Sequence, residues 1–202
     1  MEAVKFPMDL YKPHSLYNML GQSLYRVGRF EEAERWFKAS LTEKPDHVPA
    51  FLTYAKLLSR IGRSDKANNY YQRALHLKDN CDVYQHYGAF LSAADKHAEA
   101  VTLTEQGLGV CGSKDYMSLL AAANVHRQAK SYEKAKDYYR STIKLQPNIA
   151  SAHMNLGAIL HLQGFYVEAK KCYLKALQHK PGDVLITENL SKLERILSTS
   201  KK

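Results

Sequence analysis

The sequence has few residues of the kinds that break helices or cross-link small folds. Its 202 residues include only 6 Pro, 10 Gly and 3 Cys. Glycine and proline this scarce exclude a chain of many short hairpins, and three cysteines are too few for a disulfide scaffold. No run of 18 apolar residues occurs, so we expect no segment to span a bilayer. With 45% hydrophobic residues, the chain is expected to be an all-α protein.

The first residues carry no secretory signal that can be recognised. Residues 1–14 contain charges and two prolines and have no apolar core. We therefore expect either a cytosolic protein or a piece of a longer chain. The charge of +9 raises the question of an acidic or nucleic-acid partner. Because the basic residues form an interrupted stripe and also lie on many helix faces, nucleic acid is not expected.

A repeat of about 34 residues organises the chain. A small residue recurs at steps of 34, 33, 35 and 34 residues, at Ala33, Ala67, Ala100, Ala135 and Ala169. Within each period, apolar residues at three- and four-residue steps predict two amphipathic helices. Gly28, Gly62 and Gly164 fall between the two helices, where a left-handed residue commonly ends a helix. The sequence therefore predicts a right-handed α-solenoid of five helix-turn-helix units with a C-terminal capping helix.

The period also sets the expected boundaries. We predict a single array over residues 14–198, an N-terminal extension over 1–13 and a tail over 199–202. The units are expected at residues 14–47, 48–80, 81–115, 116–149 and 150–183, with the capping helix at 184–198. The third unit departs most, because its second helix contains Gly107, Gly109 and Gly112. Each glycine inside a helix costs about 1 kcal/mol relative to alanine. We expect this helix to end early or to be the softest part of the array.

The repeat resembles the tetratricopeptide repeat (TPR), a helical hairpin of 34 residues. The first unit carries the pattern at Tyr17, Leu20, Gly21, Leu24, Ala33, Phe37, Ser40 and Pro45. Small residues are needed at Gly21 and Ala33 because the two helices of a unit cross closely there. The resemblance implies a protein-binding array in which the first helix of each unit lines a concave groove.

The groove positions of the repeat carry amides, basic groups and a few rings. They are Asn18, Gln22, Tyr25, Arg26, Lys56, Arg60, Gln85, Asn124, Arg127, Asn155, His161, Asn189, Lys192 and Arg195. Amide side chains can pair with both a backbone N–H and a C=O, which suits an extended peptide. The alternative is that these residues are simply the solvated faces of helices.

No motif indicates catalysis or a cofactor. Residues 107–112 have the spacing G-x-G-x-x-G, but a dinucleotide site needs a preceding strand and must open a helix, whereas this stretch closes one. His153 and His161 are two turns apart, too far to chelate one ion, and we expect structural histidines at His153 and His126. We expect no catalytic residue, metal or cofactor in this chain.

Two features concern covalent modification. Cys81 and Cys111 lie at neighbouring ends of one predicted hairpin, so they are either two thiols or a disulfide in an oxidising compartment. The sequence Asn189-Leu190-Ser191 is an N-glycosylation sequon, although it lies in a predicted packed helix.

A closer resemblance covers nearly the whole chain from about His14. Residues 28–58, 84–91 and especially 151–193 are similar to the C-terminal part of the transmembrane and tetratricopeptide-repeat-containing protein family, most of all to its second member. The resemblance implies a parent protein with N-terminal membrane helices and protein O-mannosyltransferase activity in the endoplasmic reticulum. It also implies that this array lies in the lumen and that cadherins are among the acceptors. The catalytic residues would then lie outside this chain.

Two hypotheses therefore stand. The chain is either the luminal substrate- or partner-binding module of a membrane O-mannosyltransferase, attached to the membrane only through an absent N-terminal region, or a free-standing cytosolic TPR adaptor. Hydrophobic segments upstream of the array in the native gene would favour the first.

Overall fold

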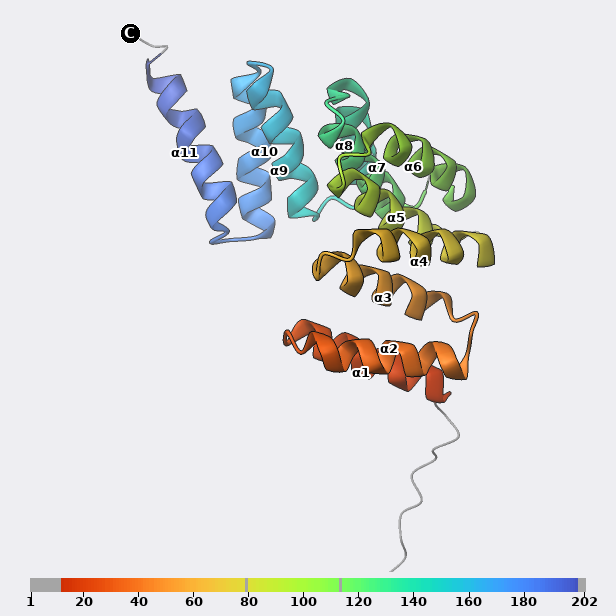
Figure 1. The fold of residues 1–202 in the computed structure, drawn as a ribbon. Helices are drawn as coiled ribbons and strands as arrows, with labels where there is room; N and C mark the ends of the chain where they lie inside the picture. Colours follow the sequence, from red (N-terminus) through yellow and green to blue (C-terminus); the bar gives the residue numbers. More distant parts are fainter. Residues whose placement is uncertain (1–11, 79, 113, 200–202) are drawn as a thin grey trace, which may run out of the picture. The chain divides into compact units, whose positions relative to one another are not determined.

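The computed structural model describes residues 12–78, 80–112 and 114–199, and all the regular structure in these ranges is helical. The described residues form eleven α-helices (Figure 1). Their bounds are α1 Pro13–Arg26, α2 Phe30–Glu43, α3 Val48–Arg60, α4 Ser64–Leu77, α5 Cys81–Ala93, α6 His97–Cys111, α7 Tyr116–Gln128, α8 Tyr132–Leu145, α9 Ala150–Leu162, α10 Tyr166–His179 and α11 Val184–Thr199. The all-α fold of helical hairpins with a final single helix is as predicted.

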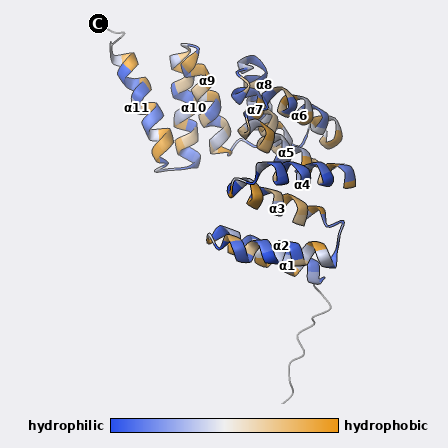
Figure 2. Ribbon diagram, in the orientation of Figure 1, coloured by the Kyte–Doolittle hydropathy of each residue, from blue (hydrophilic) through white to orange (hydrophobic). Residues whose placement is uncertain are grey.

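The helices divide into two compact units, each larger than one 34-residue repeat. The first unit comprises residues 1–90 and the second unit comprises residues 91–202. In the first unit, α1 packs on α2 and α3 packs on α4, while α3 also contacts both helices of the first hairpin. The core of this unit contains Phe37, Phe51, Leu57, Leu58 and Tyr71. Figure 2 shows α3 as largely hydrophobic and α4 as largely hydrophilic, as expected if α3 is covered by helices on more sides.

The second unit contains a chain of packed neighbours from α6 to α11. Each helix contacts the next, and α11 also contacts α9. Tyr139, Ile159, Tyr173, Ile186 and Leu193 are almost fully buried in its core. The last two lie on α11, so this helix covers the end of the hairpin formed by α9 and α10, as predicted for a capping helix.

Small residues let the helices of each hairpin approach. All five alanines that define the period are completely buried, at Ala33, Ala67, Ala100, Ala135 and Ala169. A Cβ added at Gly21 would lie 2.6 Å from Cε1 of Phe37, and one at Gly157 would lie 3.0 Å from Cδ1 of Tyr173. Real Cβ atoms do not approach as closely as 2.6 Å, so an alanine at Gly21 would force Phe37 to move. A contact of 3.0 Å is tighter than most real Cβ contacts, so Gly157 also sits at a close crossing.

The turns inside the hairpins use the left-handed backbone conformation. Gly28, Gly62 and Gly164 have φ values of 81°, 77° and 82°, as predicted. The third and fourth hairpins have Asp95 and Lys130 at the same position, both with φ of 59°. L-residues adopt this conformation only at a cost, so these two turns are locally strained.

The prediction that the second helix of the third repeat ends early is wrong. This helix, α6, runs over 15 residues from His97 to Cys111 and includes Gly107 and Gly109. It stops at Gly112, which has φ of 80° and whose N–H donates to the Leu108 carbonyl. Contacts with α7 compensate for the poor helix propensity of the two internal glycines. Whether α6 is the softest part of the array stays a prediction.

Candidate functional site

The first unit has two adjoining hollows on the side of its first helices. The smaller, of about 140 Å³, is lined by Gln22, Tyr25, Arg26, Phe37, Thr53 and Lys56. The larger, of about 340 Å³, is lined by Tyr25, Lys56, Ser59, Arg60, Tyr71, His86, Ala89 and Phe90. Tyr25 and Lys56 line both hollows, so the two form one continuous depression, which we call the unit-1 groove. Five of the predicted groove residues lie in it: Gln22, Tyr25, Arg26, Lys56 and Arg60.

Aromatic rings form the floor of the unit-1 groove. Phe37 is 1% exposed and Tyr71 is 3% exposed, so only their edges reach the hollows. The Tyr71 ring stacks on Tyr87 at 5.4 Å and contacts Phe90 at 5.1 Å between centroids. Burial raises the pKa of the Tyr71 hydroxyl, which therefore stays neutral. The floor is apolar and fixed by packing.

Basic groups form the rim. Lys56 Nζ lies 5.9 Å from the centroid of the Tyr25 ring, a cation–π geometry. Arg26 and Arg60 lie in the last turns of α1 and α3. Desolvation, followed by the charge of Lys56, lowers the pKa of His86, so this imidazole is neutral at pH 7. The unit-1 groove thus combines an apolar floor with a positively charged rim.

Asn18, the first of the fourteen predicted groove residues along the chain, is not among the residues that line the two hollows. It is 4% exposed, and its Oδ1 accepts a hydrogen bond of 2.7 Å from the Thr53 hydroxyl. This bond joins α1 to α3. Asn18 therefore holds successive first helices together.

Asn124 plays the same part in the second unit. Its Oδ1 accepts from the Tyr139 hydroxyl at 2.7 Å and from Asn155 Nδ2 at 3.1 Å, which joins α7, α8 and α9. Burial raises the pKa of Tyr139, and the nearby Arg127 guanidinium acts in the opposite direction. The structure therefore brings Asn124, Arg127 and Asn155 together, but around a buried tyrosine.

The predicted groove residues of α11 form a separate group. Lys192 and Arg195 line a surface hollow of about 500 Å³ with Thr187, Glu188 and Ser191. Asn189 is half-buried on the same helix, which places the sequon in a helix that packs on the array. Gln85 is half-buried on α5, and His161 is half-buried with its ring 5.8 Å from Tyr166. The binding role of these five residues stays a prediction.

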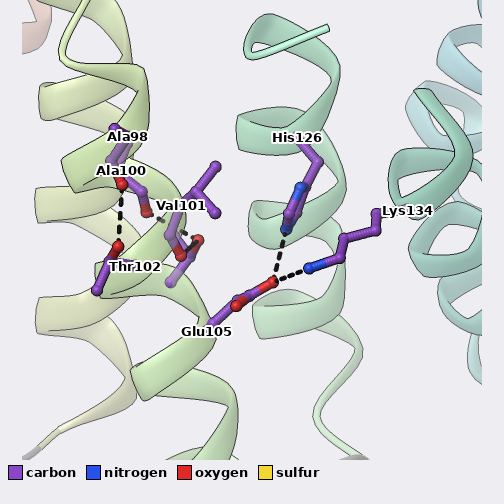
Figure 3. A network of polar contacts seen from close by, with 8 residues as sticks. Ala98, Ala100, Val101, Thr102, Glu105, His126 and Lys134 are labelled. Atoms are coloured by element: carbon purple, nitrogen blue, oxygen red, sulfur yellow. Dashed lines mark hydrogen bonds and ion pairs between the residues drawn. The ribbon is translucent and has the colours of Figure 1, made fainter. Parts of the chain in front are cut away.

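A polar network between the buried His126 and two exposed charged side chains of the second unit was not predicted (Figure 3). Glu105 of α6 points toward His126 of α7 and Lys134 of α8, with its Oε1 3.3 Å from His126 Nε2 and 2.8 Å from Lys134 Nζ. His126 is only 1% exposed, and burial lowers its pKa despite the attraction of Glu105. The expectation that His126 is structural fits this position. Glu105 lies 21 residues from His126 and 29 from Lys134, and no pattern in the sequence indicates either contact.

The cysteines give one definite observation. Cys172 is a half-buried free thiol whose pKa is raised by burial. The choice between two thiols and a disulfide at Cys81 and Cys111 stays open, and the disulfide stays a prediction. Mass mapping without reductant tests it.

Several residues of the unit-1 groove were missed from the sequence. Tyr71, His86 and Phe90 line the larger hollow, and none of them is in the predicted set. Tyr71 lies on a second helix, which the prediction did not consider, whereas His86 and Phe90 lie on the first helix α5. Tyr71 occupies the position of the packing aromatic on the second helix of the repeat. The sequence pattern indicates a core residue there and gives no sign that an edge of the ring reaches the groove. None of the helices within residues 12–78, 80–112 and 114–199 combines the length and the apolar character that a bilayer crossing needs.

Comparison with protein families gives one answer along the chain. Three family models described as tetratricopeptide repeat match residues 24–89, 118–149 and 150–183. Solved structures agree on the fold. The type IV pilus biogenesis factor PilW matches with a TM-score of 0.83 and 18% identity over 95% of this chain and 89% of that chain. YrrB, described as a TPR protein with an unusual peptide-binding site, matches with a TM-score of 0.62 and 16% identity over 85% of this chain and 89% of that chain. At such identities, the likeness shows the fold alone.

Curated relatives share more of the sequence. Human protein O-mannosyl-transferase TMTC2 is 41% identical over 196 residues, which is 97% of this chain and 23% of the relative. Human protein O-mannosyl-transferase TMTC1 is 30% identical over 182 residues, which is 88% of this chain and 20% of the relative. The chain therefore spans less than a quarter of these two relatives. With the period, the hairpins and the family matches in agreement, the chain belongs to the tetratricopeptide-repeat family and is similar to part of the TMTC protein O-mannosyl-transferases.

Proposed function

We propose that this chain is the partner-binding module of a protein O-mannosyltransferase, that it lies in the lumen of the endoplasmic reticulum, and that it holds cadherin-type acceptor domains. The similarity to TMTC2 over 97% of the chain supports the link to this enzyme class. This chain is built of tetratricopeptide repeats, so the role that we propose for it in such an enzyme is to bind a protein rather than to transfer sugar. Repeat arrays of this kind offer extended surfaces for protein ligands.

The unit-1 groove is the observation that carries the proposal. It brings five predicted groove residues together over a floor of buried rings. Aromatic floors with a few polar groups at the rim are typical of binding sites in proteins. The larger hollow, at about 340 Å³, is also within the size range of ligand pockets, about 300–1,000 Å³.

A binding measurement tests the proposal. The purified chain is immobilised, and a folded pair of extracellular cadherin repeats is passed over it. We expect saturable binding that is weakened by Tyr25→Ala, a residue at the junction of the two hollows, and kept by Tyr132→Ala on α8 of the second unit. Circular dichroism melts show whether each variant is folded. Absence of binding to folded wild-type chain would refute the acceptor role.

The compartment needs its own experiment. The chain is expressed in cells as part of its native full-length protein with a tag in the array, and protease protection is measured on microsomes. Protection of the tag supports the luminal placement. Digestion of the tag would instead support the second hypothesis, a TPR adaptor facing the cytosol.

A further inference from the structure

We propose that the unit-1 groove is specific for acidic peptide segments in which a carboxylate side chain and an aromatic side chain face the same side. This proposal rests on the proposed function, because it names the ligand class of the same surface. It follows from the charge, the lining and the dimensions of the two hollows.

The cations of the groove lack the carboxylate partners that other cations of the first unit have. Arg26, Lys56 and Arg60 line the hollows, and no Asp or Glu is among the lining residues. Within the described residues, no ion pair involves any of these three. Other basic residues of the same unit are paired with glutamates, namely Arg29, Lys38 and Arg63. The groove therefore presents positive charge that the fold itself does not neutralise.

The negative ends of two helix dipoles offset part of the positive charge of the groove, but most of that charge remains. Arg26 and Arg60 lie in the last turns of α1 and α3, where the negative end of the helix dipole favours a cation. Each helix C-terminus is equivalent to about half a negative charge, so two ends offset roughly one of the three cations. Lys56 is one turn earlier on α3 and points over the Tyr25 ring. A net charge of roughly +2 remains available for a ligand.

The rings of the floor add a second requirement. Tyr25, Tyr71 and Phe90 border the larger hollow, and Phe37 borders the smaller one. Phe37 and Tyr71 are already buried, so an apolar side chain placed there would mainly remove the exposed surface of the half-buried Tyr25 and Phe90 from water, which a purely acidic ligand would not do. A ligand that matches both the positive rim and the aromatic floor carries an aromatic residue flanked by acidic residues.

The spacing of such a ligand follows from strand geometry. In an extended peptide, residues i and i+2 face the same side and are about 6.6 Å apart along the chain. The sequence acid-x-aromatic-x-acid therefore directs all three side chains toward the groove. Carboxylates at both ends can pair with the rim cations through charge-assisted hydrogen bonds.

The test uses two short labelled peptides and fluorescence anisotropy. The acidic probe is fluorescein-Gly-Asp-Ser-Phe-Ser-Glu-Gly-amide, and its isostere has Asn for Asp and Gln for Glu. We expect the wild-type chain to bind the acidic probe at least about tenfold more tightly than the isostere, with a difference that shrinks as salt is raised.

Matched charge variants locate the effect. Lys56→Gln combined with Arg60→Gln should remove the preference for the acidic probe. Lys66→Gln combined with Lys78→Gln lowers the net charge equally at two exposed positions of α4 and its C-cap, and should keep the preference. Both double variants should retain the helical circular dichroism of the wild type, so that a loss reports on binding.

Three results would overturn the acidic-peptide assignment. They are equal affinity for the two probes, an equal loss in both double variants, and no binding of either probe to folded protein. The cadherin-repeat measurement is separate. If it succeeds while the probes fail, the groove or another face binds acceptors through different chemistry, and only this inference is lost. If it fails while the acidic probe binds, the groove is a peptide site and the acceptor proposal is lost.

Discussion

Replacing Asn124 by alanine should destabilise the second unit, because its amide links three helices. The Asn124 Oδ1 accepts hydrogen bonds from Tyr139 and Asn155, and Tyr139 is fully buried. Each neutral hydrogen bond contributes about 0.5–1.5 kcal/mol net, and an abandoned buried hydroxyl adds to the loss. We expect Asn124→Ala to lower the free energy of unfolding by about 2 kcal/mol. For a chain of this size, that corresponds to a fall in Tm of about 4–8 °C.

A double-mutant cycle isolates the bond to Tyr139. Tyr139→Phe removes the hydroxyl and keeps the ring, and should cost about 1 kcal/mol. The variant that carries both changes should be less destabilised than the two single changes predict together, with a coupling of about 1 kcal/mol. Urea titration followed by circular dichroism gives the four unfolding free energies.

The control is Gln106→Ala, which removes an exposed amide from α6 and should change stability by less than about 0.5 kcal/mol. An Asn124→Ala variant as stable as this control, with no coupling to Tyr139, would refute the structural role. The amide would then be free to bind a ligand, as expected of it from the sequence.

Four further substitutions test other parts of the fold by urea titration. Lys130→Gly should raise the free energy of unfolding by about 0.5–1 kcal/mol, because glycine adopts the φ of 59° without strain; an unchanged midpoint would count against strain there. Gly21→Ala should cost about 1–2 kcal/mol through a clash with Phe37, whereas Gly109→Ala, which meets open space, should stabilise by up to about 1 kcal/mol. Burial lowers the pKa of His126, so the unfolded chain binds its proton more readily. This residue's contribution is therefore complete above the ordinary histidine pKa of about 6.5 and falls as the pH drops below it. The free energy of unfolding of His126→Leu should therefore fall less than that of the wild type between about pH 7 and about pH 5. An equal fall in both proteins would contradict this.

The sequence was sufficient for the fold because the repeat encodes its own packing. The period places alanine or glycine where two helices cross, and it places glycine at three of the hairpin turns that have a positive φ, Gly28, Gly62 and Gly164. The same pattern failed for α6, where the internal glycines suggested an early end. Propensity is a local quantity, and the packing of α6 on α7 outweighs it.

The site was only partly predictable, since periodicity gives the face of a residue but not its partners. Tyr25 and Lys56 were expected at the groove and line both hollows. Asn18 was also expected there, yet its amide oxygen accepts a hydrogen bond from Thr53 of the next repeat along the chain. Contacts between residues 35 positions apart depend on side-chain rotamers that no pattern in one sequence specifies. His126 and Glu105 are a second example of the same limit.

The central claim is tested most directly by the affinity of the chain for a folded pair of cadherin repeats. The affinity is measured for the wild type and for two double variants, first Lys56→Gln with Arg60→Gln and second Lys66→Gln with Lys78→Gln. The account predicts saturable binding that the first double variant weakens at least about tenfold and the second leaves nearly unchanged. Equal affinity for all three proteins would contradict it, because acceptors would then be held away from the unit-1 groove.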